Sequence, residues 1–216
     1  VPFDLQKQLH NNHENLFLCE NVASEPGSQS ISANEIAFAA EKIAAASRPI
    51  IIAGLGVVNA GAKQACIGLA EQSGALLATT LPAKGLFHDQ PFCLGVAGGY
   101  ASEKAKAIFA KSDLVIGIGA RLASHSFEGG QLTPNAFVVH LDVAPQTYVQ
   151  GRHAADLLIK ADAKYGANAL SAVLDRKTGW RTPTMQQVTS DALVLPDDRI
   201  TPDGLLHPMA VIKQLA

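Results

Sequence analysis

Short runs of aliphatic residues, each ending at a glycine or a polar residue, recur along the middle of the chain. The most pronounced is LVIGIGAR at 114–121, where the apolar run stops at Gly119. A continuous apolar run bounded by turn residues is typical of a strand buried on both faces. Shorter runs of the same kind predict further strands at 50–52, 75–79, 137–141 and 157–159.

Stretches with helical spacing lie between these runs. They predict helices over 36–44, 62–72, 102–111 and 162–174. Ser32 to Glu35 fits a capping box, Ser102 and Asp162 are expected N-caps, and Gly74 is an expected C-terminal cap. Strands that alternate with helices in this way predict an α/β fold: a doubly wound, Rossmann-like parallel sheet of five or six strands with helices on both faces.

The ends of the chain have a different composition from its middle. Residues 10–30 are polar and have linker composition, and we expect residues 1–30 to be a connecting segment. The α/β domain itself is expected over 31–177. Residues 178–216 turn polar and irregular, and a short helical pattern begins at His207, so we expect the α/β domain to be the middle part of a longer protein.

Charge and composition exclude several classes of protein. The formal net charge is −2 and no basic stripe is visible, so nucleic acid is not an expected partner. No apolar run is long enough to cross a bilayer, so we expect a soluble protein without membrane contacts. Three distant cysteines without a CxxC pair favour neither zinc nor a disulfide framework. No signal peptide is visible, so a cytoplasmic location is the default expectation.

Candidate site residues follow the predicted strands, because ligands of open α/β sheets bind outside the carboxyl ends of the strands. Arg121 suits a phosphate or carboxylate, or alternatively ties down a neighbouring carboxylate. The turn that begins at Gly54 reads GxGxxN instead of GxGxxG, and no acidic residue follows the second strand. A nicotinamide-dependent dehydrogenase is therefore disfavoured, and Gly54 and Gly56 could serve the fold alone.

Two further residues keep two interpretations each. Asp142 ends a strand, where it could hold a ribose hydroxyl or cap a short helical turn near Pro145. Lys84 could face a phosphate or be a solvated loop lysine.

Cys66 falls in a predicted helix and is expected in the core. No metal-ligand spacing and no catalytic triad context is visible, so we expect no metal site and no catalytic residue in this chain.

With these elements in order, the chain resembles the central domain of the thiamine-diphosphate-dependent decarboxylases and carboligases, in particular of the acetolactate synthase large-subunit type. The resemblance is carried by segments in fixed order across nearly the whole chain: VPFDLQ, RPIIIAGLGV, LPAKGLFHDQPFCLGVAGGYAS, SDLVIGIGARL, VVHLDVAP, DLLIKAD and HPMAVIKQLA.

The resemblance implies a three-domain parent enzyme that is a homodimer or homotetramer. In the family, the catalytic glutamate lies in the N-terminal domain, and a GDG motif of the C-terminal domain holds thiamine diphosphate through Mg²⁺. No GDG occurs in this sequence. The resemblance therefore implies that this chain alone is inactive and does not bind thiamine diphosphate, and that its partners are the N- and C-terminal domains.

In several family members the central domain binds an adenine nucleotide, as FAD or ADP. By resemblance, Gly54 and Gly56 would lie near the pyrophosphate, and Leu81 and Lys84 along the cofactor. Gly119 and Arg121 would hold phosphate or ribose, with Asp142 near the adenosine. The chain departs from the family's FAD-binding pattern GxRFDDR, because it reads GARLASH from Gly119 to His125. This departure weakens the expectation of FAD specifically.

Two alternatives to a decarboxylase or carboligase fragment are considered. An autonomous nucleotide-binding regulatory module is the first, although the chain ends inside an expected helix. A nucleotide-dependent deacetylase shares the sheet topology, but it would need zinc cysteines and a catalytic histidine in a long insertion, which the sequence lacks.

Overall fold

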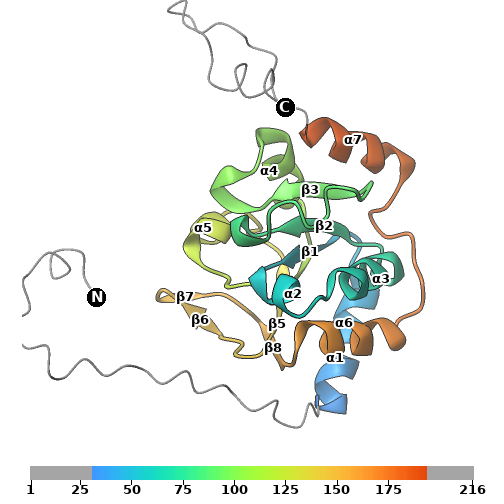
Figure 1. Cartoon of the computed structure of the whole chain (residues 1–216), viewed down its shortest axis with the longest axis vertical. Helices are drawn as coiled ribbons and strands as arrows, with labels where there is room; N and C mark the ends of the chain where they lie inside the picture. The colour runs from blue at the N-terminus through green and yellow to red at the C-terminus, as the bar shows by residue number, and fades with distance from the viewer. Residues whose placement is uncertain (1–30, 194–216) are drawn as a thin grey trace, which may run out of the picture.

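Six parallel strands form the centre of the computed structural model, which describes residues 31–193 (Figure 1). The strands lie side by side in the order β3-β2-β1-β4-β5-β8, and every neighbouring pair is parallel. Their bounds are β1 Pro49–Ala53, β2 Leu76–Thr79, β3 Cys93–Val96, β4 Leu114–Ile118, β5 Phe137–Asp142 and β8 Leu157–Lys160. The predicted parallel sheet is confirmed.

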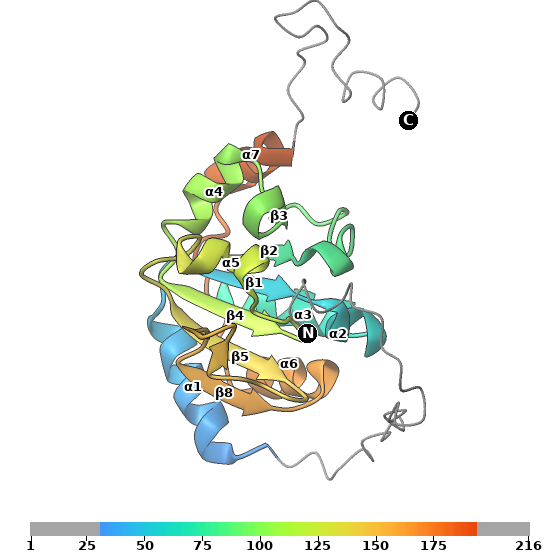
Figure 2. The ribbon, with the colours of Figure 1, turned by 90° about the vertical axis from the view of Figure 1, so that its left-hand side faces the viewer.

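Helices cover both faces of the sheet, as Figure 2 shows from the side. One core cluster joins the sheet to α1 (Ala33–Ala45), α3 (Lys63–Ser73) and α6 (Ala163–Ala172). A second cluster joins the opposite face to α4 (Glu103–Phe109), α5 (Ser124–Phe127) and α7 (Pro183–Leu193). The predicted doubly wound α/β fold is therefore confirmed.

The central strands are apolar along their whole length because both of their faces are covered. All five residues of β1 and all five of β4 are buried. Ile51 belongs to one core cluster, whereas Ile50 and Ile52 belong to the other. Successive side chains of a strand point to opposite faces, so each strand contributes to both cores.

Most of the predicted helix ends have the expected capping contacts. The Asp162 Oδ1 accepts backbone N–H groups of Lys164 and Tyr165 at the start of α6. The Ser102 hydroxyl accepts the N–H of Ala105 at the start of α4. Gly74 ends α3 in the left-handed conformation. The predicted capping box is wrong in one respect: α1 begins after Ser32, but the Ser32 hydroxyl makes no cap hydrogen bond.

Several short elements lie in stretches that the sequence predicts to be irregular. The expected loop over 85–100 contains β3, which has Gly95 at φ +77° and a register irregularity opposite β2. The strand has only four residues and Gly95 divides them, so its apolar run is too short to stand out in the sequence. The helix α7 lies within the polar stretch after 178 and packs on β3 and α4. The remaining short elements are α2 (Leu55–Asn59), the 3₁₀ turns η3 (Leu81–Ala83), η4 (Gly98–Tyr100) and η5 (Glu128–Gly130), and the hairpin β6 (Tyr148–Val149) with β7 (Arg152–His153).

The predicted domain boundaries stay predictions. Residues 1–30 and the helical pattern from His207 lie outside the described residues. The boundary expected at 177 falls in the connection between α6 and α7.

Two backbone hydrogen bonds join the turns after β1 and β4, at the point where the strand order reverses. The N–H of Gly54 donates to the Ile118 carbonyl at 2.9 Å, and the N–H of Gly56 donates to the Gly119 carbonyl at 2.9 Å. A Cβ atom on Gly54 would lie 2.1 Å from the Gly119 oxygen, and one on Gly56 would lie 2.7 Å from the Gly119 Cα. The two turns therefore touch backbone to backbone. We call this contact the glycine clamp: Gly54, Gly56 and Gly119.

The clamp predicts unequal costs for two glycine-to-alanine substitutions. Gly119 has φ +52° and its Cβ would lie 2.7 Å from the Val57 nitrogen, whereas Gly61 has φ +57° and open space around it. Gly61→Ala should lower the free energy of unfolding by about 1 kcal/mol through backbone strain alone. Gly119→Ala should lower it by roughly 2 kcal/mol more, because a backbone clash is added. Urea unfolding of the two variants measures the difference, and equal losses would contradict the clamp.

Candidate functional site at the carboxyl edge of the sheet

The candidate residues from the sequence all lie at one edge of the sheet. They follow four neighbouring strands, β2, β1, β4 and β5, and in a parallel sheet the carboxyl ends of such strands meet at the same edge. Their positions are Gly54 and Gly56 after β1, Leu81 and Lys84 after β2, Gly119 and Arg121 after β4, and Asp142 at the end of β5. The structure brings the three glycines into direct contact through the clamp.

The clamp uses the backbone donors that a phosphate would otherwise contact. The N–H groups of Gly54 and Gly56 are both hydrogen-bonded to the turn after β4. The N–H of Gly119 donates in turn to the Leu141 carbonyl at 2.8 Å, so the turn after β4 is tied to β5 as well. The structural role that sequence leaves open for Gly54 and Gly56 is therefore present in the fold. Their contact with a cofactor stays a prediction.

Two basic side chains at this edge have no acidic partner among residues 31–191. Arg121 and Lys84 are both exposed, and neither forms an ion pair there. The neighbouring Lys63, in contrast, is paired with Asp89 at 2.9 Å. The alternative interpretation of Arg121, a tie to a neighbouring carboxylate, finds no such carboxylate in this part of the chain. The positive charge of the edge is therefore available to an anion.

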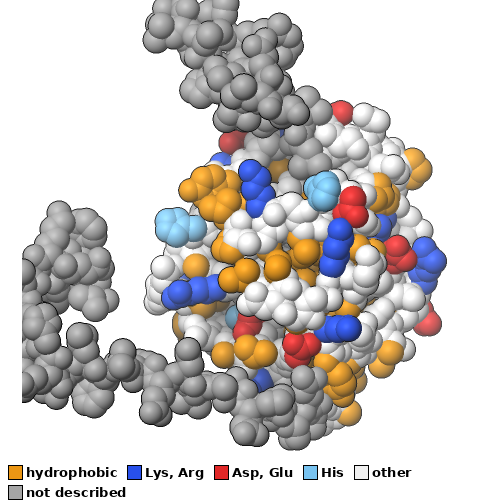
Figure 3. All heavy atoms as spheres, viewed as in Figure 1, with side chains coloured by type: hydrophobic (Ala, Val, Ile, Leu, Met, Phe, Trp, Pro, Cys, Tyr) orange, Lys and Arg blue, Asp and Glu red, His pale blue; other side chains and the backbone are white. Residues whose placement is uncertain are grey.

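Exposed apolar side chains lie beside these cations. Leu55 and Val58 of α2 are 49% and 44% exposed, and Leu81 of η3 is 46% exposed. The two elements pack against each other. Figure 3 shows a band of hydrophobic side chains across the middle of this side of the molecule, with basic side chains on both sides of the band. Such a surface combines an apolar platform with positive charge at its margins.

Asp142 is held by a contact within its own turn. Its Oδ1 accepts the N–H of Ala144 at 3.0 Å. No helical turn begins near Pro145, so the interpretation of Asp142 as a helix cap is wrong. The carboxylate is half-buried, and its ribose contact stays a prediction.

His140 is a residue of this edge that the sequence analysis did not select. It lies two residues before Asp142 on β5, is only 3% exposed, and its Nδ1 accepts the N–H of Gln146 at 3.2 Å. Burial lowers the pKa of His140, opposed by the Gln146 backbone, the Asp142 charge and the Ala120 backbone. The Nε2 atom lies 3.9 Å from Asp142 Oδ2. The one polar residue inside the apolar run FVVHL was the available signal.

The two described cysteines are buried, which disfavours the reactive thiolate form. Cys66 and Cys93 are free and buried, and burial raises the pKa of the Cys66 thiol to about 12, which confirms Cys66 as a core residue. Among residues 31–191 no group of three or more histidine, cysteine or acidic side chains is arranged to hold a metal ion. None of the helices in the described range combines the length and apolarity needed to cross a bilayer.

Two pockets formed by described residues lie away from the seven candidates. One of about 350 Å³ lies beside β7 and the turn before β5, and is lined by Arg152, His153 and Asp156 among others. The other, of about 470 Å³, lies beside the end of α3 and the connection between α6 and α7. None of the seven candidate residues lines either of these two pockets.

The chain is similar to proteins described as acetolactate synthases and to one described as a probable 2-ketoarginine decarboxylase. Over 142 residues, 65% of this chain and 24% of the relative, the chain is 34% identical to a probable acetolactate synthase large subunit of Methanocaldococcus jannaschii. Over 191 residues, 84% of this chain and 30% of the relative, it is 31% identical to an acetolactate synthase of Mycobacterium leprae. A probable 2-ketoarginine decarboxylase of Pseudomonas aeruginosa is 29% identical over 172 residues, 77% of this chain and 29% of that protein.

The chain thus spans about a quarter to a third of the length of these curated relatives. The family model described as "Thiamine pyrophosphate enzyme, central domain" matches residues 36–173, which begin in α1 and end just after α6. The matched range contains the whole six-stranded sheet and the glycine clamp. The chain therefore belongs to the family of thiamine pyrophosphate enzyme central domains.

Proposed function

We propose that this chain is the central, non-catalytic segment of a thiamine-diphosphate-dependent 2-oxo-acid decarboxylase or carboligase of the acetolactate synthase type. The family match and the names of the relatives support this assignment. Thiamine diphosphate supplies the carbanion chemistry of such enzymes. In this proposal that cofactor and Mg²⁺ are held by the N- and C-terminal domains of the same polypeptide, which acts in the cytoplasm as a homodimer or homotetramer.

Within this function, we propose that the carboxyl edge of the sheet binds an adenine nucleotide, FAD or ADP. The observation that carries the proposal is the pair of exposed cations, Arg121 and Lys84, without ion-pair partners among residues 31–191. They lie beside the exposed apolar side chains of Leu55, Val58 and Leu81. An apolar surface suits a base, and guanidinium and ammonium groups suit phosphates.

The clamp limits which of the proposed binding residues can contact the phosphates of a nucleotide. Because the N–H groups of Gly54 and Gly56 are already hydrogen-bonded, the glycines hold the two turns together instead of donating to a phosphate. In this proposal the side chains of Arg121 and Lys84 neutralise the phosphate charge. Asp142, whose Oδ2 makes no hydrogen bond to another described residue, can accept from a ribose hydroxyl.

Nucleotide binding at this edge predicts a selective loss on substitution of Arg121. Arg121→Ala should weaken ADP binding by about 1.5 to 3 kcal/mol, because a charge-assisted hydrogen bond is lost. Lys111→Ala is the matched control: Lys111 is exposed and precedes β4, so it lies at the opposite edge of the sheet. In calorimetric titrations, the affinity of the Lys111→Ala variant for ADP should equal that of the unsubstituted chain.

Two calorimetric results would overturn this assignment. Equal affinity of Arg121→Ala and the unsubstituted chain would remove Arg121 from the site. Absence of binding of either ADP or FAD to the unsubstituted chain would remove the nucleotide site altogether, without affecting the assignment to a thiamine-diphosphate-dependent parent enzyme.

The assignment to a parent enzyme predicts that the 216-residue chain has no activity by itself. With thiamine diphosphate, Mg²⁺ and pyruvate, the purified chain should release no CO₂ and form no acetolactate, because the sequence contains no GDG motif for the diphosphate and metal. A coupled assay for both products is the measurement. Turnover above a heat-denatured control would contradict the assignment of the chemistry to other domains.

A further inference from the structure

The pocket of about 470 Å³ lies at the opposite edge of the sheet from the candidate nucleotide site. It is lined by Glu71 of α3, by Phe92, and by Arg176, Lys177, Thr178 and Arg181 of the connection between α6 and α7. Glu71 lies near the end of α3, just before β2, and Phe92 directly precedes β3, so the pocket is at the amino ends of these strands. None of the seven candidate residues lines it. We call it the amino-edge pocket.

The wall that carries the basic residues is fixed to the body of the domain. The N–H of Lys177 donates to the Gln72 carbonyl at 3.0 Å, and the N–H of Trp180 donates to the Gly74 carbonyl at 2.9 Å. Gly74 and Gly179 both have positive φ and pack backbone to backbone, since a Cβ on Gly74 would lie 2.6 Å from the Gly179 Cα. The pocket is therefore preorganised and not a gap beneath a loose loop.

Lys177 has a structural task within this wall. Its Nζ donates to the carbonyl oxygens of Ile43, Ala44 and Ala46 at the end of α1. These are carbonyls that the helix itself leaves without partners. The ammonium protons are used by these contacts, but the charge remains and adds to the positive potential of the pocket.

Arg181 is the residue whose environment is incomplete. Its guanidinium stacks 4.6 Å from the centroid of the Phe92 ring, and its Nη1 atom is buried without a hydrogen-bond partner among the described residues. Burial lowers the pKa of Arg181, and the nearby Arg176 charge lowers it further against the opposing effect of Glu71. Neither arginine forms an ion pair in the described part of the chain. Both arginines line the pocket, and each charge disfavours the other, so an anion bound in the pocket would stabilise the charged form of both.

We propose that the amino-edge pocket binds a small oxyanion with two negative charges, such as a phosphate group or a dicarboxylate, through Arg181 and Arg176. Three lining cations, Arg176, Lys177 and Arg181, face one lining carboxylate, Glu71. The excess of two positive charges matches a dianion. The planar fork of arginine suits carboxylate and phosphate oxygens, and the Phe92 ring offers an apolar side for the rest of the ligand. This site is independent of the nucleotide proposal.

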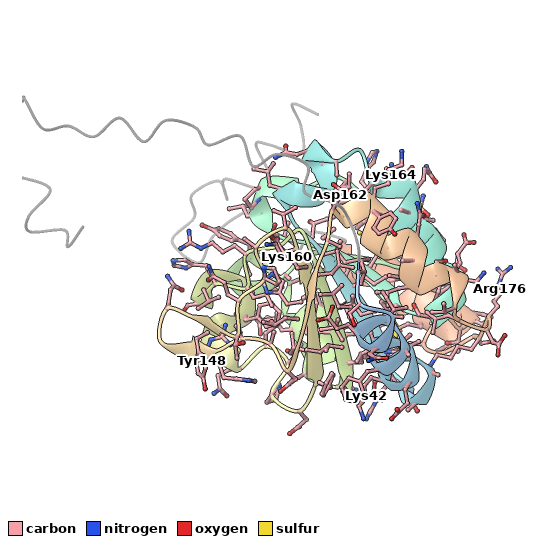
Figure 4. The ribbon with its side chains drawn as sticks, turned by 90° about the horizontal axis from the view of Figure 1, so that it is seen from below. Lys42, Tyr148, Lys160, Asp162, Lys164 and Arg176 are labelled. Carbon is pink, nitrogen blue, oxygen red and sulfur yellow. The ribbon has the colours of Figure 1, made fainter. Side chains whose placement is uncertain are left out.

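Arg176 is the best position for a test because its substitution leaves the packing intact. It is exposed and stands at the outer edge of the molecule, beyond the last turn of α6 (Figure 4). Lys164, in the first turn of the same helix, is equally exposed and does not line the pocket. Arg176→Gln and Lys164→Gln each remove one exposed positive charge, one beyond the end of α6 and one in its first turn, so they form a matched pair.

The experiment is calorimetric titration of the 216-residue chain with inorganic phosphate and, separately, with succinate, at constant ionic strength set by chloride. We expect saturable binding of at least one of these anions to the unsubstituted chain and to Lys164→Gln. Arg176→Gln should bind about tenfold more weakly or worse, because a charge-assisted hydrogen bond is removed. Phosphate binding alone identifies a phosphate ligand, and succinate binding alone identifies a dicarboxylate.

Three results would overturn the proposal. The first is that neither anion binds saturably to the unsubstituted chain. The second is equal affinity of Arg176→Gln and Lys164→Gln. The third is loss of binding in Arg121→Ala with retention in Arg176→Gln, because that result would place the anion at the carboxyl edge.

Discussion

The glycine clamp is the contact on which the carboxyl edge depends. It occurs between the neighbouring strands β1 and β4, where the strand order of the sheet reverses. The N–H group of Gly54 donates to the last residue of β4, and that of Gly56 donates to the turn after β4, across a space that admits no Cβ atom. The clamp fixes the direction in which α2 leaves β1, and with it the exposed side chains of Leu55 and Val58. Because Gly119 is also bonded to Leu141, the clamp reaches β5 and the neighbourhood of Asp142.

The glycines of the clamp have a different role from the glycines of a dinucleotide-binding turn. In a dinucleotide fingerprint the glycines let the backbone approach a pyrophosphate. In this chain the glycines let two turns approach each other, and the N–H groups of Gly54 and Gly56 donate their hydrogen bonds to that contact. Charge at the edge then has to come from side chains, and Arg121 and Lys84 are the exposed cations that follow β4 and β2. The family assignment and the proposed nucleotide site are consistent with this division between scaffold and charge.

Sequence patterns revealed the elements whose burial is strong and continuous. The strands around LVIGI and PIIIA, the caps at Asp162 and Ser102, and the left-handed end at Gly74 follow from residue type and period alone. The strand β3 was missed because it has only four residues and Gly95 divides them, which leaves a very short apolar run. Arg181 gave no signal, since its buried Nη1 and its stack on Phe92 bring together residues about ninety positions apart. Parallel topology explains why the candidate residues share an edge, but long-range contacts decide which groups remain without partners.

Hydrogen exchange of individual amides tests the clamp most directly. The account predicts that the Gly56 amide, although it lies in a short surface helix after β1, exchanges as slowly as the Ile51 and Ile116 amides inside the sheet. Its acceptor, the Gly119 carbonyl, is held by the packed backbones of both turns. Exchange of the Gly56 amide at the rate of an open loop, with the sheet amides still protected, would contradict the account.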